Sequence, residues 1–200
     1  MTKRRRAAGS LAAGATLLVT ACATPGTDAA ALSARSAILA DRFQAELQGQ
    51  LMAAMQAGGP EGAIAVCQQA APAIAESLSA ESGAQVRRIA LKERNPAART
   101  EGDLRTRLEQ LAANPLSPEG MPATMTWTEG TGRKAMVHYL RAIPMKAQPC
   151  AACHGTSIAP AVQARLAELY PDDKATGFKP GELRGAIAIT WPAGKLPPAN

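Results

Sequence analysis

Large aromatic side chains are scarce in this chain of 200 residues. It has two Phe, two Trp and two Tyr residues, although 46% of its residues are hydrophobic. Aromatic rings usually supply the bulky part of a buried core. The core must therefore be built mainly from Ala, Leu, Ile, Val and Met, unless a large flat group that is not protein fills part of it. We expect the chain to fold poorly when such a group is missing.

Histidine and cysteine are also rare, with two and four residues respectively. The sequence offers no Ser, His and Asp combination for nucleophilic catalysis and no glycine-rich loop for phosphate. An enzymatic role is therefore left open but is not the favoured interpretation.

Three of these rare residues stand together in the segment Cys150-Ala151-Ala152-Cys153-His154. C-x-x-C-H is the attachment pattern of a c-type haem, in which the thiols add to the vinyl groups and the histidine binds one face of the iron. A redox C-x-x-C pair and half of a zinc site are the alternatives. Only His138 lies near enough in sequence to supply another zinc ligand. The motif predicts one covalently bound haem c, held by Cys150 and Cys153, with His154 as an axial ligand.

The first 21 residues have the pattern of a signal peptide. Basic residues at positions 3–6 precede an uncharged apolar stretch, residues 7–19, which is too short to span a membrane. The segment Leu18-Val19-Thr20-Ala21-Cys22 resembles a lipobox, in which cleavage precedes a cysteine that then carries a lipid. The alternative is an ordinary secreted protein with a spare Cys22.

A lipoprotein of this kind would lie in the periplasm, an oxidising compartment that permits haem attachment. Ala23 rather than Asp follows Cys22, which resembles the sorting pattern of outer-membrane lipoproteins. We expect residues 22–30 to form a tether, residues 31–192 to form one haem-binding domain, and residues 193–200 to form a C-terminal tail.

The excess of basic residues comes mostly from the leader. Four of the 22 Lys and Arg residues lie there without an acid, which leaves 18 against 16 Asp and Glu residues, or a net charge of +2. Two haem propionates would offset this remainder. The sequence pI of about 9.5 is therefore no argument for nucleic-acid binding, and no nucleic-acid partner is expected.

Hydrophobic spacing predicts two helices at the start of the mature chain. Five apolar residues recur at every fourth position and line one helical face: Leu39, Phe43, Leu47, Leu51 and Met55. The first helix should run over residues 29–57 and end at Gly58-Gly59-Pro60. The second should cover residues 61–79, with a kink at Pro72.

The remaining elements alternate between strands and short helices. Thr100 or Asp103 is expected to cap the helix that ends at Ala113. The predicted elements are a strand over 85–91, the short helix that ends at Ala113, a hairpin of strands 123–128 and 134–143, a helix over 160–170, and a strand over 183–191. This order predicts an α+β domain, a small antiparallel sheet with N-terminal helices packed on it.

The sixth ligand of the iron is left open by the motif. His138, Cys67 and several methionines are candidates, and Met/His ligation is common in small cytochromes c. Met145 lies too close to the motif to cross easily to the other face, and a lone histidine in a strand is more often packed than ligating. On a helix, Cys67 would lie among Ala63, Ile64, Ala70 and Ala71, a smooth face for a porphyrin, or it could be a buried thiol that acts as a small hydrophobe.

Three ordered stretches resemble one bacterial family of monohaem c-type proteins with a PAS-like core. They are residues 65–67 with 71–75, residues 88–96, and residues 150–155 with 170–178 and 181–186. The resemblance covers about residues 29–191. It implies a PAS-like α+β fold with one covalent haem c, and it implies that Cys67 is the axial ligand opposite His154. The family often has Asn where this chain has Ala98, so any contact made by that Asn is in doubt here.

Arg88, Arg94 and Asn95 are the candidates for contact with the haem propionates. Two carboxylates in an apolar pocket need charged hydrogen-bond donors, and arginine supplies two at once. Solvated charges beside an Asn-Pro turn are the alternative. Asp172 and Asp173 are interpreted as residues that cap and solvate a turn rather than as metal ligands.

Three functions fit this set of residues. The first is redox or small-ligand sensing in the periplasm, as the resemblance implies, with the signal passed to a separate partner. The second is an electron-transfer cytochrome c. The third is a haem enzyme that oxidises sulfur compounds, although no cysteine is left over once Cys22, Cys67, Cys150 and Cys153 are assigned. A redox or signalling partner and a lipid anchor in the membrane are expected in either of the first two cases.

Overall fold

The computed structural model describes residues 25–131 and 134–192 of the chain. The expected signal peptide over residues 1–21, the lipid site at Cys22 and the expected tail over residues 193–200 lie outside the described residues. The first helix begins at Pro25, inside the stretch that we expected to serve as a tether.

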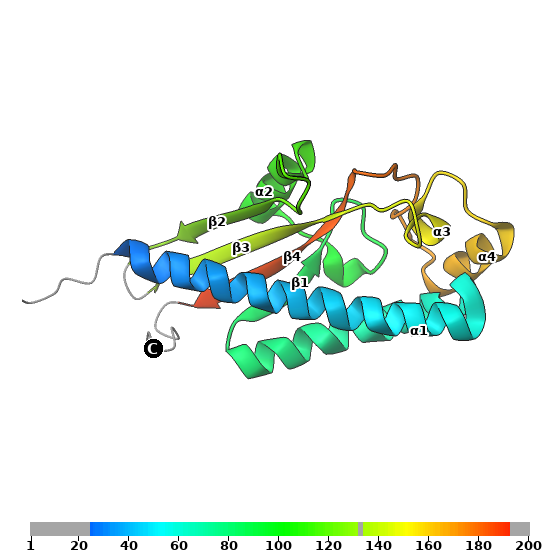
Figure 1. Ribbon diagram of the computed structural model, residues 1–200, viewed down its shortest axis with the longest axis horizontal. Helices are drawn as coiled ribbons and strands as arrows, with labels where there is room; N and C mark the ends of the chain where they lie inside the picture. The colour runs from blue at the N-terminus through cyan, green and yellow to red at the C-terminus, as the bar shows by residue number, and fades with distance from the viewer. Residues whose placement is uncertain (1–24, 132–133, 193–200) are drawn as a thin grey trace, which may run out of the picture.

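The domain consists of one four-stranded antiparallel sheet with helices on both faces (Figure 1). Its elements in chain order are α1 (Pro25–Ser82), β1 (Gln85–Ile89), the 3₁₀ helix η1 (Pro96–Ala98), α2 (Gly102–Ala113), β2 (Thr124–Glu129), β3 (Met136–Pro144), α3 (Ala151–His154), α4 (Pro160–Leu169) and β4 (Leu183–Pro192). The strands are ordered β1-β4-β3-β2, and all three pairings are antiparallel. The predicted α+β architecture, a small antiparallel sheet with an N-terminal helical segment packed on it, is confirmed.

α1 is made of two arms that meet at a glycine pair. Gly58 and Gly59 have non-helical dihedrals, and Gly59 has φ 64°, a left-handed conformation that glycine adopts without steric cost. The predicted end of the first helix at this point is confirmed. Pro72 does not interrupt the second arm, because the residues of α1 with non-helical dihedrals are Gly58 and Gly59, where the arms meet. The second arm continues to Ser82, three residues further than predicted.

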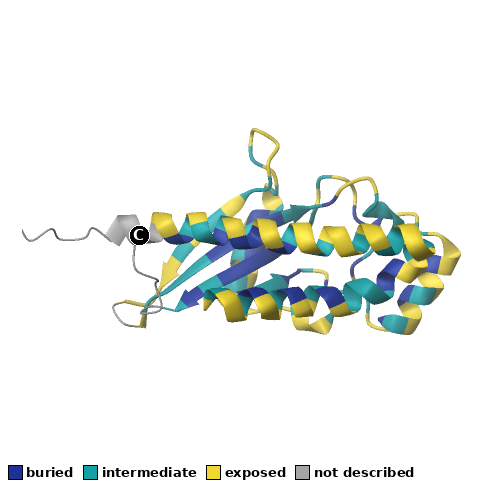
Figure 2. Ribbon diagram, turned by 60° about the horizontal axis from the view of Figure 1, so that its bottom comes forward, coloured by how far each residue is buried: buried dark blue, intermediate teal, exposed yellow. Residues whose placement is uncertain are grey.

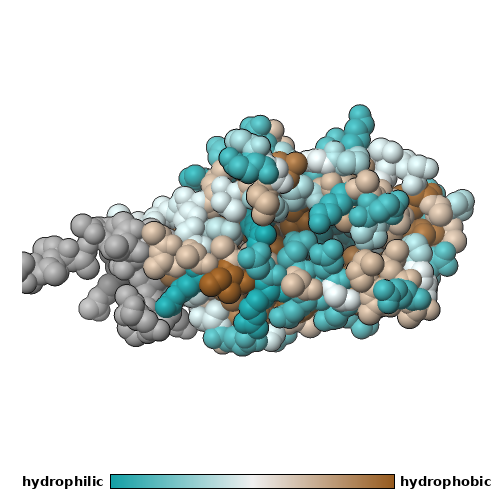
Figure 3. Space-filling model, in the orientation of Figure 1, coloured by the Kyte–Doolittle hydropathy of each residue, from teal (hydrophilic) through white to brown (hydrophobic). Residues whose placement is uncertain are grey.

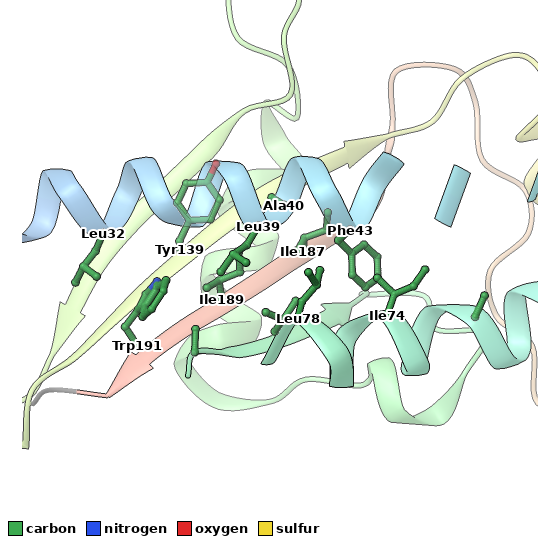
Figure 4. Close-up of a cluster of buried hydrophobic side chains, with 13 residues drawn as sticks. Leu32, Leu39, Ala40, Phe43, Ile74, Leu78, Tyr139, Ile187, Ile189 and Trp191 are labelled. Atoms are coloured by element: carbon green, nitrogen blue, oxygen red, sulfur yellow. The ribbon is translucent and has the colours of Figure 1, made fainter. Parts of the chain in front are cut away.

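Both arms of α1 bury one side against the sheet (Figure 2). The largest cluster of buried side chains joins them to β1, β3 and β4 (Figure 4). Its biggest members are Leu32, Leu39, Phe43, Ile74, Leu78, Tyr139, Ile187, Ile189 and Trp191. Three of the six aromatic residues of the chain are used here, and Trp191 Nε1 donates to Ser36 Oγ at 2.8 Å, which satisfies the one buried polar group that the indole brings.

The opposite face of the sheet is covered by α2. Leu108 and Leu111 of α2 pack on Leu140 of β3 and on the small residues Ala186 and Ala188 of β4. Because β4 is a central strand with helices on both sides, seven of its ten residues are buried. Short side chains on this face let α2 approach the sheet closely.

Capping of α2 is where the local prediction was wrong. The helix begins at Gly102, its N-cap position is Glu101, and that residue makes no side-chain capping bond. Thr100 and Asp103, which we expected as caps, lie outside that position. The first strand is also shorter than predicted, since β1 ends at Ile89 rather than at position 91.

The hairpin and the haem-motif region follow the predicted order. β2 and β3 pair from Thr124 with Arg141 to Glu129 with Met136. α3 and α4 then lie at the end of the molecule where the two arms of α1 join, far from the first turn of α1 (Figure 1). Within residues 25–131 and 134–192, none of the helices has both the length and the apolar character needed to cross a membrane.

Most of the face seen in Figure 3 carries hydrophilic or weakly apolar residues, with small hydrophobic patches between them.

Candidate functional site

A cavity of about 350 Å³ lies between α1, the segment after β1, and the segment that leads into α3. Every site residue predicted within the described part of the chain lines it. These are Cys67, Arg88, Arg94, Asn95, Cys150, Cys153 and His154. The three sequence stretches that resemble one family therefore meet at a single place in the fold, although 74 residues lie between the end of the first and the start of the last.

The wall contributed by the second arm of α1 is smooth and apolar. Ala63, Ile64, Cys67 and Ala71 line it, as their helical spacing predicted, and Ala75 continues this wall one turn further. Ala70, which we also placed on this face, instead belongs to the main hydrophobic cluster. On the first arm, Leu47 and Leu51 line the cavity, so the apolar stripe of that arm passes from the core into the cavity wall.

The thiol of Cys67 sits in this wall among positive charges. Burial raises its pKa above the ordinary value. Three nearby guanidinium groups oppose that effect, namely those of Arg88, Arg94 and Arg184. Without a metal the thiol stays protonated, whereas bonding to a metal ion would remove its proton, and the arginines would then stabilise the resulting thiolate.

Cys150 is the N-cap residue of the single-turn helix α3, and Cys153 lies within that helix. Both are free, both are partly exposed, and both line the cavity. Burial raises the pKa of the Cys153 thiol, so this thiol is not activated on its own. Gly155 ends the turn, and its N–H donates to Ala151 O at 3.0 Å.

His154 is held by the loop of residues 175–178. Its carbonyl accepts from Phe178 N, and the neighbouring Gly155 carbonyl accepts from Gly177 N, both at 3.0 Å. Its ring Nδ1 lies 2.7 Å from Ala175 O, so Nδ1 must carry the proton and donate it to that carbonyl. Nε2 is then left without a proton and able to bind a metal, the arrangement usual for a ligating histidine.

A second contact to the same ring nitrogen competes with this assignment. Arg184 Nε lies 3.1 Å from His154 Nδ1 and would donate to it. If Nδ1 were the acceptor, its lone pair would face the lone pairs of Ala175 O at 2.7 Å, which is repulsive. The Ala175 bond therefore determines the tautomer, and the Arg184 contact is a close approach of a cation to the ring. Burial and the charge of Arg184 lower the pKa of His154 well below its ordinary value, so the ring is neutral.

Arg94 fastens the haem-motif turn to the rest of the domain. Its Nε and Nη2 contact Asp173 Oδ2 at 3.0 and 2.9 Å, and Nη2 donates to Cys153 O at 2.6 Å. The two side chains of the pair are only 10% and 9% exposed. Asp173 is thus more than the solvated turn residue that we predicted, although its Oδ1 also accepts from Ala175 N at 2.8 Å in the manner of a turn cap.

Replacement of Arg94 by alanine is expected to lower the free energy of unfolding by about 3 kcal/mol, because it leaves the buried Asp173 carboxylate without its partner. Chemical denaturation of Arg94→Ala, Asp173→Ala and the double variant would measure this. The double variant should lose less than the sum of the single losses. Strict additivity would show that the two side chains do not stabilise each other.

Glu93 provides a second link between the same segments. Its carboxylate is 8% exposed and accepts from Lys174 Nζ at 2.9 Å and from Arg99 Nη2 at 3.0 Å. The backbone adds a bond from Lys174 N to Glu93 O at 3.0 Å. The hydrogen bond from Lys174 is the main reason that the pKa of Glu93 falls from 4.5 to about 2.

This lowered pKa predicts a loss of stability in acid. The folded state binds the Glu93 proton less readily than the unfolded state, so the stabilisation is full above pH 4.5 and is lost as the pH falls toward about 2. Because Lys174 and Arg99 are both 57% exposed, we expect a contribution of about 2 kcal/mol or less. Denaturation of Glu93→Gln at pH 6 and pH 3 should show a reduced difference between the two pH values. Glu109→Gln, on the exposed side of α2, should behave like the unaltered protein, and an unreduced difference in Glu93→Gln would contradict the account.

Asn95 and Ala98 belong to the turn that closes one side of the cavity. Asn95 Oδ1 accepts from Ala97 N at 3.0 Å and caps η1, in agreement with the interpretation of Asn-Pro as a turn. Ala98, at the position where the resembling family often has Asn, also lines the cavity. Its carbonyl accepts from Ala90 N at 2.9 Å, a backbone bond that does not depend on the side chain.

The other candidates for a sixth ligand occupy different surroundings. His138 bonds Thr190 Oγ1 at 3.0 Å and Glu129 Oε2 at 3.1 Å, and its ring stacks on Trp127, so it is a packed strand histidine outside the cavity. Met145 lines the cavity but is 3% exposed and packs with Ala175 and Phe178.

Arg184 is the residue that sequence reasoning missed. It is the second residue of β4, is 7% exposed, and lines the cavity. Two contacts partly accommodate the guanidinium group, the Phe178 ring at 5.5 Å and Lys92 O at 3.4 Å from Nη1. The segment Gly181-Glu182-Leu183-Arg184-Gly185 was recognised as part of the resemblance, but a single arginine at the start of a strand gives no separate signal of burial.

These residues have the chemistry that a c-type haem requires. An apolar wall faces two free thiols on one turn, an imidazole with Nε2 available lies beside them, and a third sulfur lies in the opposing helix. Arginines with no carboxylate partner among the described residues supply donors for two propionates. The donor set fits the group that the sequence motif predicts.

Comparisons with known proteins agree in part with this site. The family model described as Tll0287-like: Tll0287 matches residues 24–192. A similar solved structure is that of the cyanobacterial heme-protein Tll0287, with 29% sequence identity, a TM-score of 0.61, and coverage of 85% of this chain and 97% of that one. The comparison with curated proteins found no match.

Proposed function

The chain belongs to the Tll0287-like family, and from this membership and the cavity we propose that it is a periplasmic protein carrying one haem c that works in redox or small-ligand sensing through a separate partner. The single observation that carries the proposal is that three residues of one turn share a cavity with a fourth residue more than 80 positions earlier in the sequence. Cys67, Cys150, Cys153 and His154 line one cavity, with the C-x-x-C-H turn opposite a helix. The similarity to a solved structure titled as a heme-protein supports the choice of cofactor.

Each of these side chains has a distinct task in the proposal. Cys150 and Cys153 would supply the thiols for two thioether bonds, and His154 would offer Nε2 to the iron while Ala175 O holds the ring in place. Cys67 would supply a thiolate from the second arm of α1. When bound, the haem supplies one-electron chemistry and a position at the iron that a small molecule can occupy.

The position of Cys67 suggests how a change at the iron could reach the surface. It lies on the second arm of α1, whose neighbouring residues Ala70, Ile74 and Leu78 are buried in the main cluster. As an anionic ligand, Cys67 would favour ferric over ferrous iron, so its hold on the iron would be weaker in the reduced protein. Release of Cys67 would free this arm to shift against the sheet. The arm would then have two positions, which a partner protein could distinguish.

We also propose the finer features of fold and location. The sheet with its N-terminal helices is a PAS-like core, residues 31–192 form the haem-binding domain, and residues 1–21 are a lipoprotein signal peptide. The lipid at Cys22 would anchor the protein in the periplasm, at the outer membrane, with residues 22–24 as the remainder of the tether before α1. Residues 193–200 are a tail.

The test uses the haem-loaded protein isolated from the periplasm. Carbon monoxide or nitric oxide should bind only after reduction, and hydrogen exchange in residues 61–82 should rise at the same time. Unchanged hydrogen exchange in residues 61–82 after reduction, with or without ligand binding, would contradict sensing.

Electron transfer is the second candidate, and one observation favours it. The cavity is open at its rim, where the exposed residues Gln48 and Lys146 contribute to its lining, so a haem edge there would be accessible to a redox partner. Fast and reversible exchange with a periplasmic cytochrome, with no ligand binding to the reduced state, would favour this function over sensing.

A further inference from the structure

Two arginines in the cavity have no carboxylate partner within the described part of the chain. Arg88 makes no hydrogen bond and no ion pair there, and Arg184 makes no ion pair. Arg94, which the sequence also suggested as a propionate contact, is instead neutralised by Asp173. Among the described groups that line or border this part of the cavity, positive charges therefore outnumber carboxylates.

An unpaired buried cation is unfavourable, because its hydration is lost and nothing replaces it. Burial is the main cause that lowers the pKa of both Arg88 and Arg184. The positive charges of neighbouring arginines lower the pKa of each group further. Arginines in this situation are usually paired with an anion, either a carboxylate of the protein or an anionic group of a bound cofactor.

We propose that Arg88 and Arg184 form a carboxylate-binding pair that holds the two propionates of the haem. The inference rests on the proposed function, since it needs a bound haem. Arg88 extends from β1 and Arg184 from the adjoining strand β4, so the two side chains start from neighbouring strands of the sheet. Guanidinium groups suit this task because each offers paired donors to one carboxylate.

The pair also explains the unusual place of Arg184 beside the axial histidine. Its Nε lies 3.1 Å from His154 Nδ1, whose proton is already given to Ala175 O. A propionate bound to Arg184 would accept from its donors and neutralise its charge at this point. By offsetting the negative charge of the propionates, the two arginines would favour the reduced haem, whose charge is more negative by one.

Redox titration of the haem-loaded protein tests the proposal. Arg88→Gln is the main variant, because Arg88 has no described protein hydrogen bond to lose. At the midpoint potential of the unaltered protein, we expect the ratio of reduced to oxidised haem to fall about tenfold in Arg88→Gln, which corresponds to 59 mV for a one-electron couple. Arg184→Gln should give a fall of the same sign, and Arg184→Lys a smaller one because the charge is kept.

Arg105→Gln is the matched control, since it removes one arginine from the exposed side of α2, where Arg105 pairs with Glu109. Resonance Raman spectra should show a shift of the propionate bending modes in the Arg88 and Arg184 variants and none in the control. Unchanged potentials and unchanged propionate modes would overturn the proposal.

A free anion from the medium could offer the same carboxylate-like chemistry. In that case the potential of the unaltered protein would depend on the concentration of added acetate or phosphate, and the propionate modes of the variants would not move. That result would also overturn the proposal. A protein that carries no haem at all would instead contradict the proposed function, so the two failures are distinguishable.

Discussion

Replacement of both Cys150 and Cys153 by alanine is expected to abolish covalent haem attachment and the sharp thermal unfolding transition. Without thioethers, no haem should stay with the chain in denaturing electrophoresis. The reason for the loss of cooperativity is the composition of the core, which has six aromatic residues in 200 and a cavity of about 350 Å³ where other proteins have side chains.

The size of this effect follows from the cost of an unfilled cavity. At roughly 24 cal/mol for each Å³ of cavity, the empty space would cost on the order of 8 kcal/mol, an upper figure because water can enter the open rim. Domains of this kind have a total stability of about 5–15 kcal/mol. Loss of the haem should therefore remove most of the stability of the fold.

Circular dichroism melts and haem staining would measure both results. Cys67→Ala is the matched control, since it removes one cavity thiol without affecting the thioether bonds and should retain haem on a denaturing gel. A sharp, cooperative transition in the Cys150→Ala/Cys153→Ala variant would contradict the claim that the haem completes the core.

The second large effect is expected at the iron when Cys67 is replaced by alanine. The ferric protein should lose the low-spin spectrum of the unaltered protein, because one axial ligand is missing. The midpoint potential should rise by on the order of 100 mV or more, since removal of an anionic ligand destabilises the ferric state. Spectra recorded during a redox titration would give both quantities.

Cys67→Met separates the loss of charge from the loss of a ligand. A thioether is neutral but can still bind iron, so this variant should stay low-spin while its potential also rises. Retention of the original ferric low-spin bands in Cys67→Ala would show that another group binds the iron opposite His154.

Much of the fold could be predicted because local signals agreed with the global arrangement. The stripe from Leu39 to Met55 and the stop at Gly58-Gly59 each predicted a feature that is present, and the two strands of the predicted hairpin pair. Pro72 lies inside the second arm without ending it. Proline removes one helical hydrogen bond, but packing of Ile74 and Leu78 on the sheet holds the second arm helical across it.

The N-terminus of α2 is a similar case. Thr100 and Asp103 are good capping residues, yet Glu101 takes the N-cap position without a side-chain bond. Thr100 is 6% exposed, so its side chain is packed rather than free to cap the helix. Tertiary contacts of this kind leave no mark in a short stretch of sequence.

The sequence predicted which residues form the site but not which side chains those residues pair with. Cys67, Arg88 and the C-x-x-C-H segment line one cavity, as their shared resemblance suggested. The sequence did not show that Arg94 has a carboxylate partner and Arg184 has none among the described residues. The partner of Arg94 is Asp173, which is 79 residues away and reaches it only in the folded chain. Pairing with Asp173 satisfies Arg94, whereas Arg184 is left facing the cavity.

The most direct test of the central claim is the mass of one tryptic peptide from protein produced with periplasmic haem attachment. Cleavage after Lys146 and Arg165 releases residues 147–165, which contain Cys150, Cys153 and His154. The account predicts that this peptide carries the added mass of one haem and that the peptide with Cys67, residues 43–87, carries none. Recovery of peptide 147–165 with two free thiols, or with a disulfide between them, would contradict it.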